Sequence, residues 1–403
     1  MKTRTIAGKA AFCLLCMGLS ILPLTAFSSE ARHSSLTLNP MVEDLVDIAD
    51  FPGLTGAYRN SIYLNIAQSG TTIPDGNAGF LIGDTVVAGA WINRTPRFND
   101  FEKIEDLYNF DLPTVHNIAD LFLGTKIGFG LRLSLSTGLL TQDSQYSTED
   151  DELYSQGQSA FGMEITPGFS FETPRYHGDF GLGISFSAFE VAVQGRSAFK
   201  NKWIPSTRFR HRSIIGPQQT TAWVIDLSID HRAYGAEAQG ENTADGMYNH
   251  VIGAAVVGPR IALPKDVTFW GGLRLMVEHL SGEVASFPTQ KQTAIGVPGV
   301  LLSTEVEFLE YFAFRAGVNY DIYWAILSTP DSADTDGDDD RDELIAKRRT
   351  VIQRFNWSTG LGVNLDGFQI DGTVSQDLYL TGPNVIGGGT PGFLGMLSAT
   401  YMW

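Results

Sequence analysis

Apolar and polar side chains alternate with a period of two over long stretches of the C-terminal half of the chain. In residues 311–326 every second side chain from Phe312 to Trp324 is apolar or aromatic, and Arg315, Asn319 and Asp321 stand between them. The same alternation recurs in residues 220–234, 267–280, 301–309, 353–364 and 367–380. Successive side chains of a strand point to opposite faces, so this pattern predicts β-strands with one apolar and one polar face.

The lengths of the segments and their connections favour a membrane barrel over a soluble β-sandwich. The segments are about 10–15 residues long, whereas soluble strands have about 5–6 residues and tilted membrane strands need about 9–11. Tight connections at 264–266, 309–311 and 365–367 alternate with long segments, which the pattern predicts to be loops at 235–250, 281–297 and 328–352. Short turns at one rim and longer loops at the other are typical of transmembrane β-barrels.

The N-terminal half continues the pattern with less regularity. Its predicted strands lie near residues 58–67, 76–83, 85–95, 117–127, 130–141, 160–171, 180–195 and 207–215, with long loops at 96–116 and 142–159. The segments 76–83 and 207–215 are the weakest of these. The predicted fold is therefore all-β: one closed antiparallel transmembrane β-barrel of about 14–16 strands over residues 58–403, with short periplasmic turns and longer extracellular loops. A soluble exported β-sandwich is the alternative fold.

Residues 1–31 have the pattern of an export signal. Lys2, Arg4 and Lys9 precede an apolar run, and small residues offer a cleavage site somewhere in 26–31. The only two cysteines, Cys13 and Cys16, lie in this segment, so the mature chain lacks disulfides and thiolate metal sites. The formal net charge of −17 argues against a nucleic-acid partner. Residues 32–57 then form a periplasmic N-terminal segment and a candidate lumen plug.

Charged residues of the polar set are expected to face the lumen, because an arginine at the bilayer midplane costs about 2–4 kcal/mol. The predicted lumen-facing residues are Asp226, Asp230, Arg274, Glu278, Glu305, Glu307, Arg315, Asp321, Arg354 and Asp371. Arg315 is expected to pair with Glu305 or Glu307 across a tight turn, and Asp226 and Asp230 with the arginines of 208–212. The scattered histidines, His211, His231 and His250 among them, are expected at rims or surfaces. No catalytic signature is present, which predicts a protein that is not an enzyme.

An acidic run in the 328–352 segment is a candidate Ca²⁺ loop. Its alternating carboxylates are Asp334, Asp336, Asp338, Asp340 and Asp342. Oxygen ligands at every second position suit a hard cation, and Gly337 permits a tight bend. Asp339 replaces a second glycine and Ile345 stands at the twelfth position, so a solvated acidic loop tip is the alternative. Ca²⁺ is the only cofactor that the sequence suggests.

Two segments resemble known barrel families. The final strand, Phe393 to Trp403, resembles the terminal-aromatic strand of bacterial outer-membrane barrels, which implies recognition by the barrel-assembly machinery. Residues 36–66, with Asn39-Pro40 ahead of the first strand, resemble the start of the long-chain fatty-acid transporter superfamily and its secretion-associated relatives, as does the stretch 314–321. Met41 departs from the alanine common there. This resemblance implies fourteen strands, an N-terminal hatch in the barrel mouth, and passage of hydrophobic compounds or a partner role.

The sequence therefore predicts an outer-membrane channel or transporter for passive passage of small solutes, hydrophobic ones among them. Its expected partners are such solutes, outer-membrane lipid, lipopolysaccharide and the assembly machinery. The alternatives are a non-conducting barrel that acts as a scaffold, adhesion or secretion-system subunit, and the soluble exported sandwich. Whether the lumen is open or packed distinguishes the transporter from the non-conducting barrel.

Overall fold

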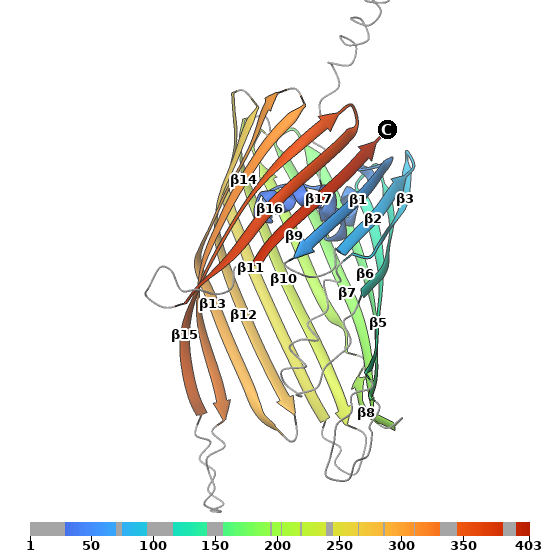
Figure 1. Ribbon diagram of the computed structural model, residues 1–403, viewed down its shortest axis with the longest axis vertical. Helices are drawn as coiled ribbons and strands as arrows, with labels where there is room; N and C mark the ends of the chain where they lie inside the picture. The colour runs from blue at the N-terminus through green and yellow to red at the C-terminus, as the bar shows by residue number, and fades with distance from the viewer. Residues whose placement is uncertain are drawn as a thin grey trace, which may run out of the picture.

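The strands of the chain form one closed antiparallel sheet. The computed structural model describes residues 29–69, 75–94, 116–142, 156–193, 196–202, 204–217, 220–238, 245–264, 266–284, 287–309, 311–330, 345–381 and 392–403. With one exception, described below, each strand pairs with the strands before and after it, and β1 pairs with β17 to close the barrel (Figure 1). The predicted closed antiparallel barrel is confirmed.

Seventeen strands are described, and they fill sixteen positions around the barrel. Their bounds are β1 (Ser61–Ser69), β2 (Asp75–Ile82), β3 (Val86–Ile92), β4 (His116–Thr125), β5 (Phe129–Gln142), β6 (Gln156–Thr173), β7 (Tyr176–Val193), β8 (Arg196–Lys202), β9 (Ser206–Ile215), β10 (Thr221–Ala238), β11 (Asp245–Leu263), β12 (Val267–Val284), β13 (Phe287–Leu309), β14 (Phe312–Pro330), β15 (Ile345–Leu365), β16 (Phe368–Thr381) and β17 (Gly392–Met402). Both β8 and β9 lie between β7 and β10, so they form one interrupted position. The weakly patterned segments 76–83 and 207–215 are both strands, which gives sixteen positions rather than fourteen.

Tight turns join the strands at one rim of the barrel, and we call it the short-turn rim. Examples are the connections between β6 and β7, β13 and β14, and β15 and β16. At the opposite rim, the predicted loops 235–250 and 281–297 are wrong, because β10 runs to Ala238, β11 begins at Asp245, β12 runs to Val284 and β13 begins at Phe287. The central part of the loop 328–352 lies outside the described residues, as do most of 96–116 and 142–159.

The outer face of the barrel is apolar. Cross-strand neighbours Val277, Ile295, Trp324 and Val351 form one outward row, and each side chain is 42–47% exposed. On β12 the outward apolar set runs from Val267 to Val277, which matches the about 9–11 residues that a tilted strand needs to cross the hydrocarbon core. The outer surface is therefore the one that a lipid bilayer requires. In the described part of the chain, no helix has the length and hydrophobicity for a membrane span.

The N-terminal segment lies inside the barrel near the short-turn rim (Figure 1). It consists of helix α2 (Glu30–Ser35), the 3-10 helices η1 (Leu45–Ala49) and η2 (Pro52–Gly56), and the turns between them. Ser29 caps α2 by accepting a hydrogen bond from the backbone N–H of Arg32 at 3.0 Å. Pro52 begins η2, a position where its missing N–H costs nothing. We call residues 29–58 the inner segment.

Candidate functional site

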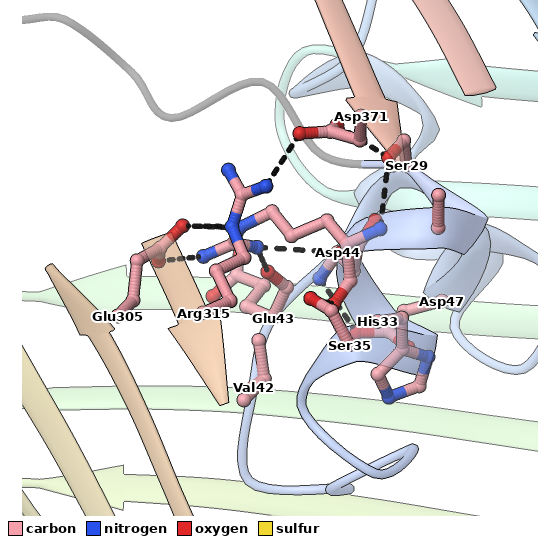
Figure 2. Close-up of polar contacts among 12 residues, drawn as sticks. Ser29, His33, Ser35, Val42, Glu43, Asp44, Asp47, Glu305, Arg315 and Asp371 are labelled. Carbon is pink, nitrogen blue, oxygen red and sulfur yellow. Dashed lines mark hydrogen bonds and ion pairs between the residues drawn. The ribbon is translucent and has the colours of Figure 1, made fainter. Parts of the chain in front are cut away.

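Arg32 on helix α2 connects the inner segment to the barrel wall through a buried ion-pair network. Its guanidinium donates to both carboxylate oxygens of Glu305 at 3.0 and 2.7 Å, and it lies 3.3 Å from Asp44. Arg315 donates to the same Glu305 at 2.6 Å and to Asp371 at 2.5 Å. The hydroxyl of Ser29 closes the chain of contacts by donating to Asp371 (Figure 2). The network therefore ties α2 to β13, β14 and β16.

A second network lies on another stretch of the wall and centres on Arg212 of β9. Its guanidinium contacts Asp47 of η1 at 2.7 Å and Asp179 of β7 at 2.9 Å, and it lies 4.9 Å from the ring centroid of Phe51. His177 contacts the same Asp179 at 2.8 Å. Arginine presents several donors in a planar fork, so one side chain can join two carboxylates from different segments. Residues of 45–51 are thereby attached to β7 and β9.

The neighbouring arginines of β9 pair partly as the sequence predicts. Arg208 and Arg210 both contact Asp230, at 3.3 and 3.2 Å, and Arg208 also contacts Asp50 of the inner segment at 3.2 Å. Asp226 is the cross-strand neighbour of Arg212, but the ion pairs of Arg212 go to Asp47 and Asp179 instead. Two of the three arginines, Arg208 and Arg212, therefore also pair with carboxylates of the inner segment, beyond the predicted cross-strand pairs.

Apolar contacts inside the barrel surround the inner segment on two sides. One buried cluster joins Leu36, Met41 and Val42 to wall residues Ile214, Ala222, Val224, Val256, Trp270 and Leu301. The other joins Leu45, Ile48, Phe51 and Leu54 to wall residues Tyr63, Leu81, Val87, Trp91 and Phe122. Predicting a wholly polar inner face was therefore wrong near the short-turn rim. Burial of these side chains stabilises the segment by about 25 cal/mol for each Å² of apolar surface removed from water.

Backbone of the inner segment also packs directly on backbone of the wall. A Cβ atom at Gly130 would overlap the carbonyl of Pro52, and one at Gly181 would overlap the carbonyl of Asp50. Glycine is required at both positions because any side chain would push the inner segment away from the wall. The contact is therefore close-packed rather than a loose insertion.

The packed segment begins three residues before the predicted boundary at residue 32. Glu30 accepts hydrogen bonds from Tyr63, Asn65 and Asn77 at 2.6–3.0 Å, and the N–H of Ala31 donates to Ser398. Signal cleavage after Ser28 would keep these contacts and the Ser29–Asp371 bond in the mature chain. Cleavage after Ala31 would remove all of them. We therefore expect cleavage before Ser29, and N-terminal sequencing of the mature protein checks it.

Charged groups also line the lumen toward the rim opposite the short-turn rim, which we call the long-loop rim. Arg274 pairs with Asp321 and donates to Asn319, and His250 lies 2.7 Å from Glu278. His250 is 2% exposed, so its predicted surface position is wrong. Arg354 is the cross-strand neighbour of Asp321, whereas Glu307 is exposed at the short-turn rim. The candidate Ca²⁺ residues of 334–342 lie outside the described residues.

Two inner-segment groups have shifted pKa values. Burial, and then the carboxylates of Asp179 and Asp47, raise the pKa of Glu43, although Arg212 and His177 oppose the shift. Burial alone would lower the pKa of Arg32, but the attraction and hydrogen bonds of Glu305 outweigh it and raise the pKa. Arg32 therefore keeps its charge inside the barrel, as the ion pair with Glu305 requires.

Removing the shared carboxylate of Glu305 is expected to loosen the inner segment. Glu305→Gln deprives the buried guanidiniums of Arg32 and Arg315 of one partner each, and breaking a buried ion pair costs about 3–5 kcal/mol. Urea titration of the refolded protein measures the loss, and limited proteolysis shows whether residues 29–58 become cleavable. Glu307→Gln is the matched control, because Glu307 is exposed on the same strand. Equal stability of the two variants would contradict this account of the network.

No family model and no curated protein matches the chain. Solved structures with some similarity include a FadL homologue of Pseudomonas aeruginosa, at 11% identity and a TM-score of 0.45, covering 94% of this chain and 99% of that one. The Pseudomonas putida toluene transporter TodX is 8% identical, with a TM-score of 0.41 and coverage of 94% and 98%. CdiB from Escherichia coli is 11% identical, with a TM-score of 0.42 and coverage of 85% and 62%. At these values no property of those proteins transfers to this chain.

The architecture itself defines the class. The chain is an even-numbered, closed antiparallel β-barrel with an apolar outer face, polar groups inside and both ends of the sheet at one rim. This is the architecture of bacterial outer-membrane β-barrels. Inside this barrel, ion pairs and apolar packing hold an inner segment in the lumen.

Proposed function

We propose that the protein is an outer-membrane channel or transporter whose inner segment plugs the lumen at the periplasmic end. It would pass small solutes, hydrophobic ones among them, passively and only when the inner segment moves or rearranges. The observation that carries the proposal is the placement of residues 29–58 inside the short-turn rim, attached to two separate stretches of the wall through Arg32 and Arg212.

The two rims of the barrel indicate its orientation in the membrane. Transmembrane barrels have their short turns on the periplasmic side, and the strand pair β1–β17 places both ends of the sheet there. Barrels with sixteen to eighteen strands leave an aqueous channel unless something fills it. The inner segment therefore lies where a solute that has entered from the long-loop rim would have to leave.

One large apolar side chain of the inner segment, that of Leu38, points away from the packing. Leu38 is 62% exposed, and both Thr37 and Leu38 have left-handed backbone, with φ of 61° and 52°. Neighbouring Thr37 and Asn39 are held by Ser358 and Ser303 at 3.1 and 3.0 Å. Two consecutive residues in this sparsely populated conformation cost roughly 1–2 kcal/mol each. The exposed Leu38 is a contact point for an apolar solute under this proposal.

The non-conducting scaffold remains the second candidate, and the density of inner-segment contacts favours it. Two ion-pair networks, two apolar clusters and backbone contact at Gly130 and Gly181 all oppose displacement. A segment held permanently would leave the barrel closed, with its surface available to a partner. The two candidates therefore differ in whether the inner segment moves.

A reversible disulfide tests this movement. The side chains of Asn39 and Ser303 lie in hydrogen-bond contact at 3.0 Å, and the chain's only cysteines lie in the predicted signal segment. In proteoliposomes, oxidised Asn39→Cys/Ser303→Cys is expected to block uptake of small apolar and polar solutes, and reduction is expected to restore it. The single-cysteine variants are the controls. Absence of any solute uptake in the reduced and wild-type proteins would contradict the transport proposal and favour the non-conducting scaffold.

A further inference from the structure

The outer wall of β10–β15 changes from apolar to mixed, with polar and basic side chains, near the long-loop rim. The outward row with Ile229, Val277, Ile295, Trp324 and Val351 is apolar. The next outward row runs across the same strands and consists of His231, Val251, His279, Thr293, Ile326 and Arg349. Lys291 follows one row further on the same face. Basic side chains, Arg349 and then Lys291, therefore appear on the outer face where the continuous apolar rows end.

These side chains are available from outside the barrel. His279, Lys291 and Arg349 are exposed, and the exposed neighbours Ile295 and Trp324 show that their shared face points outward. The Nδ1 atom of His279 lies 3.0 Å from the hydroxyl of Thr293, which holds the imidazole against the sheet. Lys347 occupies the same row as Lys291 by strand register, with Ser328 between them. We call Lys291 and Arg349 the rim cations.

Long strands make this surface rigid. Strands β12–β15 continue past the apolar row, to Val284 on β12 and from Phe287 on β13, so the rim cations stand on hydrogen-bonded sheet rather than on loops. Strand β13 carries Lys291 and strand β15 carries Arg349, and only β14 lies between them. Neighbouring strands lie about 4.8 Å apart, so two long cationic side chains can reach one group about the size of a phosphate.

We propose that the rim cations bind the phosphate groups of a phosphorylated glycolipid in the outer leaflet of the membrane. Arginine and lysine form charge-assisted hydrogen bonds to phosphate oxygens, and Trp324, one row below, suits the interface between acyl chains and headgroups. The apolar rows of β12–β15 would contact the acyl chains of the same lipid. This inference rests on the outer-membrane placement in the proposed function, but not on transport.

Comparison with the short-turn rim indicates which lipid the rim cations bind. Lys126 and Arg175 are also exposed, but they lie in separate tight turns of the short-turn rim, between β4 and β5 and between β6 and β7. They stand on turns, whereas Lys291 and Arg349 stand on paired strands. A lipid that carries its phosphates only on the long-loop side therefore matches the rim cations, and a phospholipid present in both leaflets does not explain the asymmetry.

Binding to purified protein in detergent micelles tests the proposal, with bisphosphorylated lipid A as the probe and native mass spectrometry as the readout. Lys291→Gln/Arg349→Gln is expected to weaken lipid A binding at least about tenfold, because it removes two charge-assisted contacts. Lys126→Gln/Arg175→Gln removes the same charge at the other rim and is expected to bind as the wild type does. Lipid A lacking one phosphate is expected to bind more weakly to the wild type.

Three results would overturn the inference. They are equal lipid A binding by the two double variants, displacement of lipid A by millimolar inorganic phosphate alone, and equal binding of phosphatidylglycerol. The second would indicate a free-anion site and the third an unspecific cationic surface. The same variants are also folded in phosphatidylcholine vesicles and checked for heat-modifiable migration. This control separates a failure of lipid A binding from a failure of the membrane placement, because a protein that enters no bilayer would show no vesicle-dependent folding.

Discussion

Deletion of residues 32–57 is expected to turn a closed barrel into a conducting pore. The deleted residues supply Arg32, Asp47 and both sets of inner-segment apolar side chains, whereas the strand pairing from β1 to β17 needs none of them. A barrel of sixteen strand positions is wide enough for a water-filled lumen once nothing occupies it. We expect single-channel conductance in planar bilayers to rise at least about tenfold, which is the largest functional effect that the structure predicts.

Adding back the missing segment distinguishes an opened lumen from a damaged barrel. A synthetic peptide of residues 29–58, applied on the short-turn side, is expected to reduce the conductance of the deletion variant toward that of the wild type. The same peptide with Arg32 and Phe51 replaced by alanine lacks an ion pair and a buried ring, and is the control. Unchanged conductance after the deletion, in protein that still shows heat-modifiable migration, would contradict the plugged-lumen account.

The second large effect concerns the outer wall. Leu273 is 58% exposed near the middle of the outward apolar set on β12. Leu273→Arg is expected to lower the free energy of folding into vesicles by about 2–4 kcal/mol, the cost of an arginine at the bilayer midplane. Urea titration in phosphatidylcholine vesicles measures it.

Met276→Arg is the matched control, because Met276 lies on the same strand but on the inner face, three residues away. Its arginine would reach the wet part of the lumen, so we expect a cost well below that of Leu273→Arg. Equal costs for the two variants would show that the two faces of β12 do not differ as membrane and lumen do.

The outward face could be predicted from sequence because one physical rule governs it: every second residue contacts hydrocarbon. The inward face near the short-turn rim could not, because the inner segment replaces water there. A signal was present in adjacent apolar pairs that interrupt the alternation. In Phe80-Leu81, Ile214-Ile215, Val256-Val257, Phe269-Trp270 and Leu301-Leu302, one member faces outward and the other packs in an inner cluster. Such pairs indicate wall positions with an apolar partner inside.

Loop lengths were wrong for a related reason. Residues 235–250 and 281–297 have polar side chains in both alternate sets, which resembles loop composition. Beyond the hydrocarbon layer both faces of a strand are wet, so alternation no longer reports on strand structure there. The strands β10–β13 therefore extend further than the pattern indicates.

Some of the ion pairs could likewise be predicted from the sequence, and others could not. Glu305 and Arg315 are joined by a tight turn, so their contact follows from strand register alone. The contact of Arg32 with Glu305 spans 273 residues of sequence, and no local pattern predicts it. Asp47 and Arg212 likewise meet only because the inner segment folds back into the barrel. The lumen charges were predictable as a set, and so was the pair of Glu305 with Arg315, but the partners that the inner segment supplies were not.

Tryptophan fluorescence in brominated lipid tests the central claim most directly. Trp324 is 47% exposed on the outer face, whereas Trp91 and Trp270 are 2% and 3% exposed and pack against the inner segment. In single-tryptophan variants reconstituted in vesicles of brominated phosphatidylcholine, Trp324 is expected to be strongly quenched, and Trp91 and Trp270 nearly unquenched. Strong quenching at Trp270 together with an unquenched Trp324 would show that the faces assigned to lipid and lumen are reversed, and no quenching at any of the three would show that no bilayer surrounds the barrel.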